Sequence, residues 1–380
     1  MTTLMLDIRA NGAGIARYGR RLLTESAPRL GELADKVYAV AHDQDVPELA
    51  LPGGAVELVT APSDEGRYVW RRDDWLRELV ADVRPNLFYT TNYTMDADHD
   101  GPFVVTIHDL VRLMRPETAS DAEFVARYGR AELARLREVA PHRDGPVFAP
   151  YFAALTGKLA SRASLVATVS AATAKDIRSV LGVPADRISI VPSAVDEVFR
   201  PRDPSALRRR FSLGDRYFLF VGVAGNRKKV DWLIRSFGRV LPRTQLVVAG
   251  GDAEYRADIR HALADAGPVV FTGRISDEDL AALYTGAVAC LSASAQEGFD
   301  LPPAEAMACG SEAIVTAIPA HREVLGRHAH YFPVGDEVRF GRLVTAAFEG
   351  RLPRLAPGYA PPTWQAASRA FLRTIERALR

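Results

Sequence analysis

The chain has 380 residues, of which 48% are hydrophobic and 25% are charged. That length is too great for one ordinary core and suits two α/β domains of roughly 150–200 residues each. The formal net charge of +1 excludes the strong basic excess that is typical of nucleic-acid-binding proteins.

The N-terminal residues and the cysteines indicate the expected compartment. MTTLMLDIRANGAG has neither a basic region nor a long apolar run, so we expect no signal peptide. No run approaches the roughly eighteen consecutive apolar residues of a membrane span. Cys290 and Cys309 lie in small or apolar surroundings without a second ligand at metal-binding spacing, which predicts buried free thiols. We therefore expect a cytoplasmic protein.

Short apolar runs alternate with amphipathic stretches along the chain, a pattern typical of parallel α/β sheets. The first half has expected strands at 4–8, 36–41, 56–59, 86–90, 103–109, 165–170 and 188–192, with helices at 15–27 and 171–182. The second half has expected strands at 217–222, 245–251, 268–273, 288–294 and 312–317, with helices at 230–240, 255–267, 276–287 and 302–310. The predicted fold class is α/β, with two Rossmann-like, doubly wound domains and a ligand site in the cleft between them.

The domain boundaries are expected at polar, proline-marked positions. The segment 199-FRPRDPSALRRRF predicts a linker, so we expect an N-terminal domain over 1–198 and a second domain over 199–361. Apolar residues at helical spacing predict a C-terminal helix over 362–380. An Arg-rich helical stretch over 121–150 interrupts the regular alternation.

Two glutamates flank a turn in 296-QEGFDLPPAEAMACG-310. We expect the preceding strand to end in a Gly turn and a helix to begin at Pro302 or Pro303, because proline is favoured in the first helical turn. Such a helix N-terminus binds anions. Glu305, expected in the first turn, is suited to accept hydrogen bonds from a ribose diol, and Glu297 is expected to face the same cleft. The alternative is a capping arrangement with a surface glutamate.

A second candidate anion site follows an apolar strand in 220-FVGVAGNRKKVDWLI. The strand ends at Gly222, and Arg227 and Lys228 lie before the next helix. Cations at the carboxyl end of a strand are placed to face a bound phosphate. The alternative is a solvated, charged helix end.

Together these segments resemble the retaining nucleotide-sugar glycosyltransferases of glycosyltransferase family 4, which have the GT-B fold. The segment 297-EGFDLPPAEAMACG resembles the family's E-x7-E motif, commonly EGFGLPxLEAMAxG, and 220-FVGVAGNRKKVDWLIRSF resembles its VGTLEPRKNLxxLLxAF segment. In the first half, 14-GIARYGRRLL is similar to GIGRYxxxLL, and 104-VVTIHDLVRLMRPE is similar to TIHDLxxLxxPE. Further similarity at 167-ATVSAATAKDI, at 190-IVPSAVDEVFRP and in the final helix extends the resemblance over nearly the whole chain.

The resemblance implies transfer of a mannose-like or glucose-like hexose from a nucleoside diphosphate sugar to an acceptor hydroxyl, with retention and without a metal or cofactor. It implies that Arg227 and Lys228 stabilise the diphosphate, that Glu305 binds the ribose, and that Glu297 contacts the sugar. His108 would stabilise the oxocarbenium-like state. The remaining donor-site positions that it implies are Gly14, with Gly12 beside it, Gly222, Gly298, Phe299, Asp300 and Leu301. Asp300 departs from the family, which usually has glycine there, so donor recognition is expected to differ.

The acceptor is expected to bind the N-terminal domain, and the final helix is expected to cross back to that domain. We expect 121–150 to form an acceptor-side lid whose arginines suit an anionic acceptor or a lipid headgroup surface; a solvated helix with charge pairs is the alternative. The candidate acceptor residues are Tyr93, Asp109, Arg127 and Arg130. A saccharide, a secondary metabolite or a lipid-linked acceptor all fit, and peripheral membrane contact stays open. The alternatives to a transferase are a non-catalytic nucleotide-sugar-binding protein and a GT-B-fold epimerase.

Overall fold

The computed structural model describes residues 1–10, 13–49, 51, 54, 56–62, 73–92, 99–140, 144–222, 227–251 and 267–380. The chain divides into two compact units. Unit 1 comprises Met1–Ala194 together with Thr363–Arg380, and unit 2 comprises Val195–Pro362. The expected linker at 199 lies close to this division.

Unit 1 is built on a seven-stranded parallel sheet in the order β3-β2-β1-β4-β5-β6-β7. Its strands are β1 Thr3–Asp7, β2 Lys36–His42, β3 Glu57–Ala61, β4 Leu87–Thr90, β5 Phe103–Ile107, β6 Leu165–Thr168 and β7 Ile188–Ile190. All residues of β1, β4, β5 and β6 are buried. Helices cover both faces of these central strands, which explains their continuous apolar runs.

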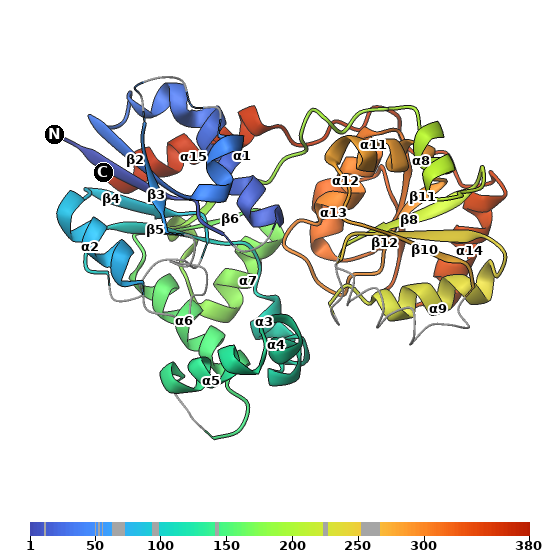
Figure 1. Ribbon diagram of the computed structural model, residues 1–380, viewed down its shortest axis with the longest axis horizontal. Helices are drawn as coiled ribbons and strands as arrows, with labels where there is room; N and C mark the ends of the chain where they lie inside the picture. Colours follow the sequence, from blue (N-terminus) through green and yellow to red (C-terminus); the bar gives the residue numbers. More distant parts are fainter. Residues whose placement is uncertain are drawn as a thin grey trace. The chain divides into compact units, whose positions relative to one another are not determined.

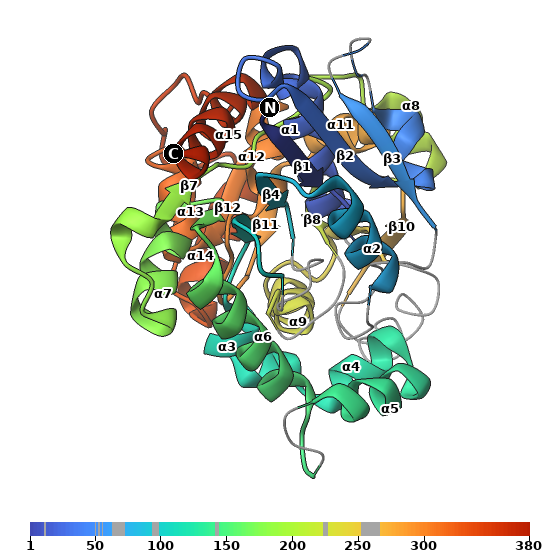
Figure 2. The same cartoon turned by 90° about the vertical axis from the view of Figure 1, so that its left-hand side faces the viewer.

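Most helices of unit 1 cover the two faces of the sheet, whereas the helix pair within 121–139 packs against the start of another helix instead. The helices of this unit are α1 Ala13–Leu30, α2 Asp74–Val83, α3 Val111–Met114, α4 Asp121–Tyr128, α5 Arg130–Val139, α6 Phe148–Arg162, α7 Ala171–Leu181 and α15 Trp364–Leu379. Helices α1 and α15 pack side by side on one face, and α2 and α6 lie on the other (Figures 1 and 2). Short 3-10 turns occur at Asp43–Glu48, Pro116–Ala119 and Ala185–Arg187.

The C-terminal helix α15 belongs to the core of unit 1. The Phe371 ring lies edge-on to Tyr89 of β4, with the ring centroids 4.8 Å apart. The hydroxyl groups of Ser368 and Ser26 are 2.8 Å apart, which joins α15 to α1 inside the protein. The chain therefore leaves unit 2 and completes unit 1 with its last helix.

Unit 2 has a six-stranded parallel sheet in the order β10-β9-β8-β11-β12-β13. Its strands are β8 Tyr217–Val221, β9 Gln245–Ala249, β10 Val269–Gly273, β11 Ala289–Ser292, β12 Glu312–Thr316 and β13 His330–Phe332. Its helices are α8 Ser205–Arg210, α9 Val230–Val240, α11 Asp277–Gly286, α12 Leu301–Ala308, α13 Pro319–Leu325 and α14 Glu337–Phe348. Two apolar clusters, one on each face, bury this sheet. The order is that of a nucleotide-binding Rossmann sheet.

The twelve predicted strands all coincide with observed strands, although several end earlier than expected. Strand β13 was not predicted, and the predicted helix at 255–267 lies outside the described residues except for Gly267. Cys290 and Cys309 are free and buried, as predicted. Across the described ranges, no helix is long and apolar enough to span a membrane.

The packing of α15 leads to a stability prediction. Phe371→Ala should lower the free energy of unfolding by about 3–5 kcal/mol, because it leaves a cavity against Tyr89 in the core of unit 1. Urea unfolding followed by circular dichroism measures this loss. Gln365→Ala, an exposed substitution on the same helix, is the control and should change stability by less than about 0.5 kcal/mol. Equal small effects of both substitutions would contradict this packing.

Candidate functional site

The segments after β8 and β11 meet at one point of the sheet in unit 2. These strands are neighbours, yet β8 is followed along the chain by β9 on its other side. The order therefore reverses between β8 and β11, and ligands of doubly wound sheets bind beyond the carboxyl ends of the strands at such a point. The Ala295 amide donates a hydrogen bond of 2.9 Å to the Arg227 carbonyl, which joins the two segments directly.

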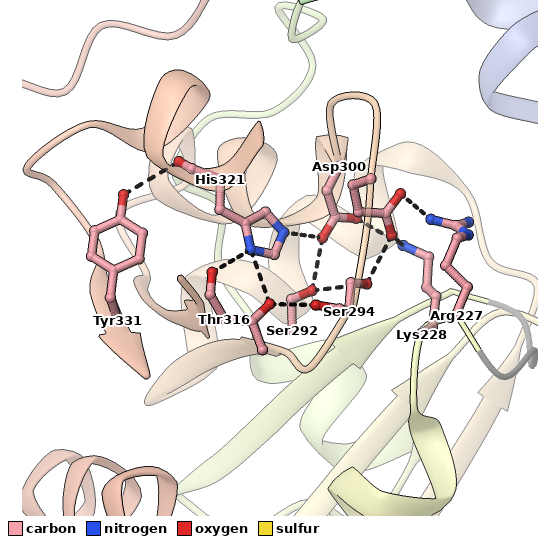
Figure 3. Close-up of polar contacts among 9 residues, drawn as sticks. Arg227, Lys228, Ser292, Ser294, Asp300, Thr316, His321 and Tyr331 are labelled. Atoms are coloured by element: carbon pink, nitrogen blue, oxygen red, sulfur yellow. Dashed lines mark hydrogen bonds and ion pairs between the residues drawn. The ribbon is translucent and has the colours of Figure 1, made fainter. Parts of the chain in front are cut away.

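Two cations and two carboxylates form an ion-pair cluster at this point (Figure 3). Arg227 pairs with Glu297. Lys228 Nζ lies 3.1 Å from Glu297 Oε1 and 2.7 Å from Asp300 Oδ1. The Ser294 hydroxyl donates to Glu297 Oε1 over 2.8 Å. The structure thus brings together four predicted site residues from two segments that are far apart in the chain.

Asp300 is the most enclosed member of the cluster, with a side chain that is 1% exposed. Its Oδ1 accepts from Lys228, and its Oδ2 accepts from the Ser292 hydroxyl at 2.7 Å and lies 2.9 Å from His321 Nε2. Burial alone would raise the pKa of Asp300, but the charge of Lys228 and the contact with His321 hold it below its usual value. Asp300 is therefore ionised at neutral pH.

The backbone at Asp300 adopts the left-handed conformation, with φ 66° and ψ 77°. This residue precedes α12, and its side chain makes no capping hydrogen bond to the helix. Helix α12 begins at Leu301, so the prediction of a start at Pro302 or Pro303 was late. The left-handed residue turns the carboxylate toward Lys228 and away from the helix N-terminus.

Lys228 remains charged although it is buried. Burial by itself lowers the pKa of Lys228, but the charges of Asp300 and Glu297 outweigh burial and raise it above its ordinary value. Gly222 makes room for this side chain, because a Cβ there would lie 3.2 Å from Lys228 Cδ and φ at Gly222 is 152°. Gly222 therefore borders the cation rather than merely ending a strand.

Glu305 lies deeper than the sequence analysis predicted. It is in the second turn of α12 rather than the first, and only 4% of the residue is exposed. Its Oε2 accepts a hydrogen bond of 3.0 Å from the Tyr284 hydroxyl. Burial and the neighbouring carboxylate raise the pKa of Tyr284 well above its usual value, so this hydroxyl keeps its proton. The other predicted donor-site positions in this segment are Gly298 and Phe299, which are buried, and Leu301, which is partly buried.

The predicted residues of the N-terminal half lie in unit 1. His108 follows β5, and its Nε2 lies 2.7 Å from the Thr91 carbonyl, to which it donates. Burial lowers the pKa of His108, an effect that the hydrogen bond to Thr91 and the nearby Asp109 partly oppose. Asp109 Oδ1 accepts from the Val111 amide over 3.0 Å. Gly14 is exposed in α1, and the position that a Cβ would occupy there is open space.

The predicted acceptor segment is a folded helix pair. Helices α4 and α5 share a small apolar core with the start of α6, formed by Phe124, Leu136 and Phe148. Asp121 Oδ2 accepts from Arg137 at 2.9 Å, and Asp121 Oδ1 accepts from the Phe148 amide at 3.0 Å. Asp121, the first residue of α4, therefore links α4 to α5 and to the start of α6.

The arginines of this segment differ in their surroundings. Arg135 pairs with Glu132, three residues before it on α5, and Arg137 pairs with Asp121 of α4. Neither of these is an i,i+4 pair of the kind expected for a solvated helix, and the acceptor-side lid stays a prediction. Arg130 is exposed at the start of α5. Tyr93, Gly12, Arg143 and the side chain of Arg127 lie outside the described residues.

His321 and the hydroxyl groups near it were not predicted as site residues. His321 lies near the start of α13, just after β12, and is fully buried against Asp300. Its position directly after a strand was the one available signal. In the described ranges, no group of three or more His, Cys, Asp or Glu side chains is arranged to hold a metal ion. The roles that the resemblance implies for the individual residues stay predictions.

Comparison with known families matches both halves of the chain. Residues 19–199 match the model of the family described as Glycosyltransferase Family 4, and residues 215–349 match that described as Glycosyl transferases group 1. The serotype-specific mannosyltransferase WbdA of Escherichia coli is 31% identical over 180 residues, which are 43% of this chain and 22% of that protein. The chain thus spans about a fifth of that longer relative.

Two further proteins resemble most of the chain. The O-antigen chain mannosyltransferase RfbU of Salmonella typhimurium is 27% identical over 263 residues, covering 67% of this chain and 69% of that protein. The crystal structure of Anabaena HepE in complex with UDP and glucose superposes with a TM-score of 0.62 at 15% identity, covering 99% of this chain and 95% of that one. At that identity the superposition shows the fold alone. The chain belongs to glycosyltransferase family 4, the group 1 glycosyl transferases, and has the GT-B fold.

Proposed function

We propose that this protein transfers a hexose from a nucleoside diphosphate sugar to an acceptor hydroxyl, with retention of the anomeric configuration and without a metal ion. The observation that carries the proposal is the pair of cations, Arg227 and Lys228, beside α12 at the point where the strand order of unit 2 reverses. Cleavage of the donor leaves negative charge on the diphosphate. Fixed cations and helix N-terminal amides stabilise such charge as it develops.

The chemistry proposed is a same-face substitution. The bond between the anomeric carbon and the diphosphate oxygen breaks, the bond to the acceptor oxygen forms on the same face, and the acceptor proton passes to the leaving phosphate. Glu297 is held by Arg227, Lys228 and Ser294, which supports a role in orienting the sugar rather than as a nucleophile. A double displacement would instead need two carboxylates flanking the sugar.

The relatives suggest donors to test. WbdA and RfbU are named as mannosyltransferases, and the HepE structure holds UDP and glucose. We therefore propose a mannose-like or glucose-like hexose as the group transferred. For the acceptor we propose a saccharide bound by unit 1, with α4 and α5 beside it. The exposed Arg130 suits an anionic acceptor.

Turnover with a panel of donors tests this function. Purified protein is incubated with UDP-, GDP- and dTDP-linked hexoses and saccharide acceptors, and products are followed by NMR. We expect release of a nucleoside diphosphate and an acceptor product with the anomeric configuration of the donor. An epimerised nucleotide sugar without any acceptor would instead show an epimerase. Binding without turnover across the panel would favour the non-catalytic alternative.

Lys228 should contribute strongly to the reaction. We expect Lys228→Gln to lower kcat/KM by about 10²–10³-fold, because a charged hydrogen-bond donor to the diphosphate is lost. Lys229→Gln is the matched control, because within the described residues this neighbouring lysine forms no ion pair. Its kcat/KM should stay within about twofold of the original. Similar losses in both variants would contradict a specific role for Lys228.

The neutral state of His108 produces a pH-dependent stability. The unfolded chain takes up a proton at His108 as the pH falls through 6.5, whereas burial lowers the pKa in the folded state. The unfolded state therefore binds more protons, and the free energy of unfolding falls as the pH is lowered. His108→Gln should make the decrease between pH 7.5 and 5.5 smaller. Urea unfolding at the two pH values measures it; an equal decrease in both proteins would show that His108 titrates normally.

A further inference from the structure

A histidine and an aspartate form a buried pair behind the cations of unit 2. His321 is fully buried, and its Nε2 lies 2.9 Å from Asp300 Oδ2 (Figure 3). Neither residue is needed to explain the pairing of Glu297 with Arg227. The protonation state of His321 follows from the hydrogen bonds around it.

The Nδ1 atom of His321 carries a hydrogen. It lies 2.8 Å from the Thr316 carbonyl oxygen, which only accepts hydrogen bonds. The Thr316 hydroxyl is also near, at 3.3 Å, but its hydrogen is donated to the Ser294 carbonyl over 2.6 Å. The hydroxyl therefore has no hydrogen left to offer His321, and Nδ1 must be the donor to the Thr316 carbonyl.

The Nε2 atom also has a hydrogen in its contact with Asp300. Without one, a nitrogen lone pair would face a carboxylate oxygen at 2.9 Å. The carboxylate already accepts from the Ser292 hydroxyl and from Lys228, and both contacts favour its ionised form. The proton in this contact therefore belongs to the ring, so both ring nitrogens are protonated.

We propose that His321 is a positioning residue that carries a fixed positive charge and so preserves the charge of Lys228 for the donor diphosphate. Asp300 holds Lys228 in place at 2.7 Å, but an unopposed carboxylate there would also cancel the lysine's charge. The imidazolium supplies the second cation that Asp300 needs. The proposal rests on the function proposed above and explains how this chain accommodates an acid beside its phosphate-binding lysine.

The charge of the cluster shows what His321 contributes. Arg227, Lys228 and a charged His321 face Glu297 and Asp300, which leaves one net positive charge. With a neutral side chain at 321 the same cluster would be neutral. The positive charge of His321 therefore favours binding of a diphosphate, although the diphosphate does not contact this side chain.

Binding of free UDP and GDP, measured by isothermal titration calorimetry, tests the inference. His321→Gln keeps a hydrogen-bond donor for Asp300 but removes the charge, and we expect it to raise the Kd of the nucleotide that binds about tenfold or more. The matched control is His330→Gln on β13, because His330 is also buried and its Nε2 lies 3.3 Å from a carboxylate, that of Glu312. The control should leave Kd within about twofold.

A second background separates this electrostatic role from a structural one. Asp300→Gly removes the carboxylate and suits the left-handed backbone at this position. In that background the buried ring has no carboxylate partner to stabilise its charge, so we expect it to be neutral and His321→Gln to change Kd by less than about twofold. Equal losses from His321→Gln with and without the Asp300 carboxylate would overturn the proposal.

Nitrogen NMR of the ligand-free protein tests the protonation directly. We expect both ring nitrogens of His321 to show the chemical shifts of a doubly protonated ring, as their two acceptor contacts require, in the wild type and in His330→Gln alike. A neutral ring at position 321 would overturn the inference whatever the binding data show. Absence of UDP and GDP binding to the wild type, with an imidazolium present, would count against the proposed function instead.

Discussion

Lys228 and Asp300 place opposite charges 2.7 Å apart inside unit 2, and the surrounding structure follows from the need to keep both ionised. A charge taken out of water is retained only when partners replace its hydration. Asp300 has three such partners, in Lys228, Ser292 and His321. Lys228 in turn has a second carboxylate, Glu297. Removing one member leaves the others incompletely paired, so the residues form one unit rather than separate ion pairs.

The sheet order places this cluster at one edge of the sheet of unit 2. Strands β8 and β11 are adjacent, and the chain continues from β8 to β9 on one side and from β11 to β12 on the other. The segments that follow β8 and β11 therefore lie next to each other at the carboxyl edge of the sheet. The bond from Ala295 to Arg227 fixes their separation. Gly222 leaves space for the lysine stem at the same edge. The charges are thus presented where a doubly wound sheet binds its ligand, although Asp300 itself is buried.

Sequence predicted the fold more completely than the site. Continuous apolar runs identify the central strands because helices cover both of their faces, whereas the three residues of β13 are too short to show a period. Similarity to family motifs predicted Arg227, Lys228 and Glu297 as site residues, and the structure places them together. The predicted start of α12 and the predicted helical turn for Glu305 were wrong, because no residue near Asp300 in the sequence indicates that this aspartate adopts the left-handed conformation. His321 was missed because its contact with Asp300 arises from the pairing of β11 with β12.

Asp300 stands where the family usually has glycine, and its backbone conformation is one that glycine adopts without strain. An aspartate there incurs a conformational penalty of roughly 1 kcal/mol. The same geometry aims its carboxylate at Lys228, and the ion pair and hydrogen bonds offset the penalty. With a side chain that is 1% exposed, Asp300 has almost no surface with which to contact a sugar. Under the function proposed above, the effect of Asp300 on the donor would therefore pass through the position and charge of Lys228, and a histidine that contacts Asp300 becomes part of the same constraint.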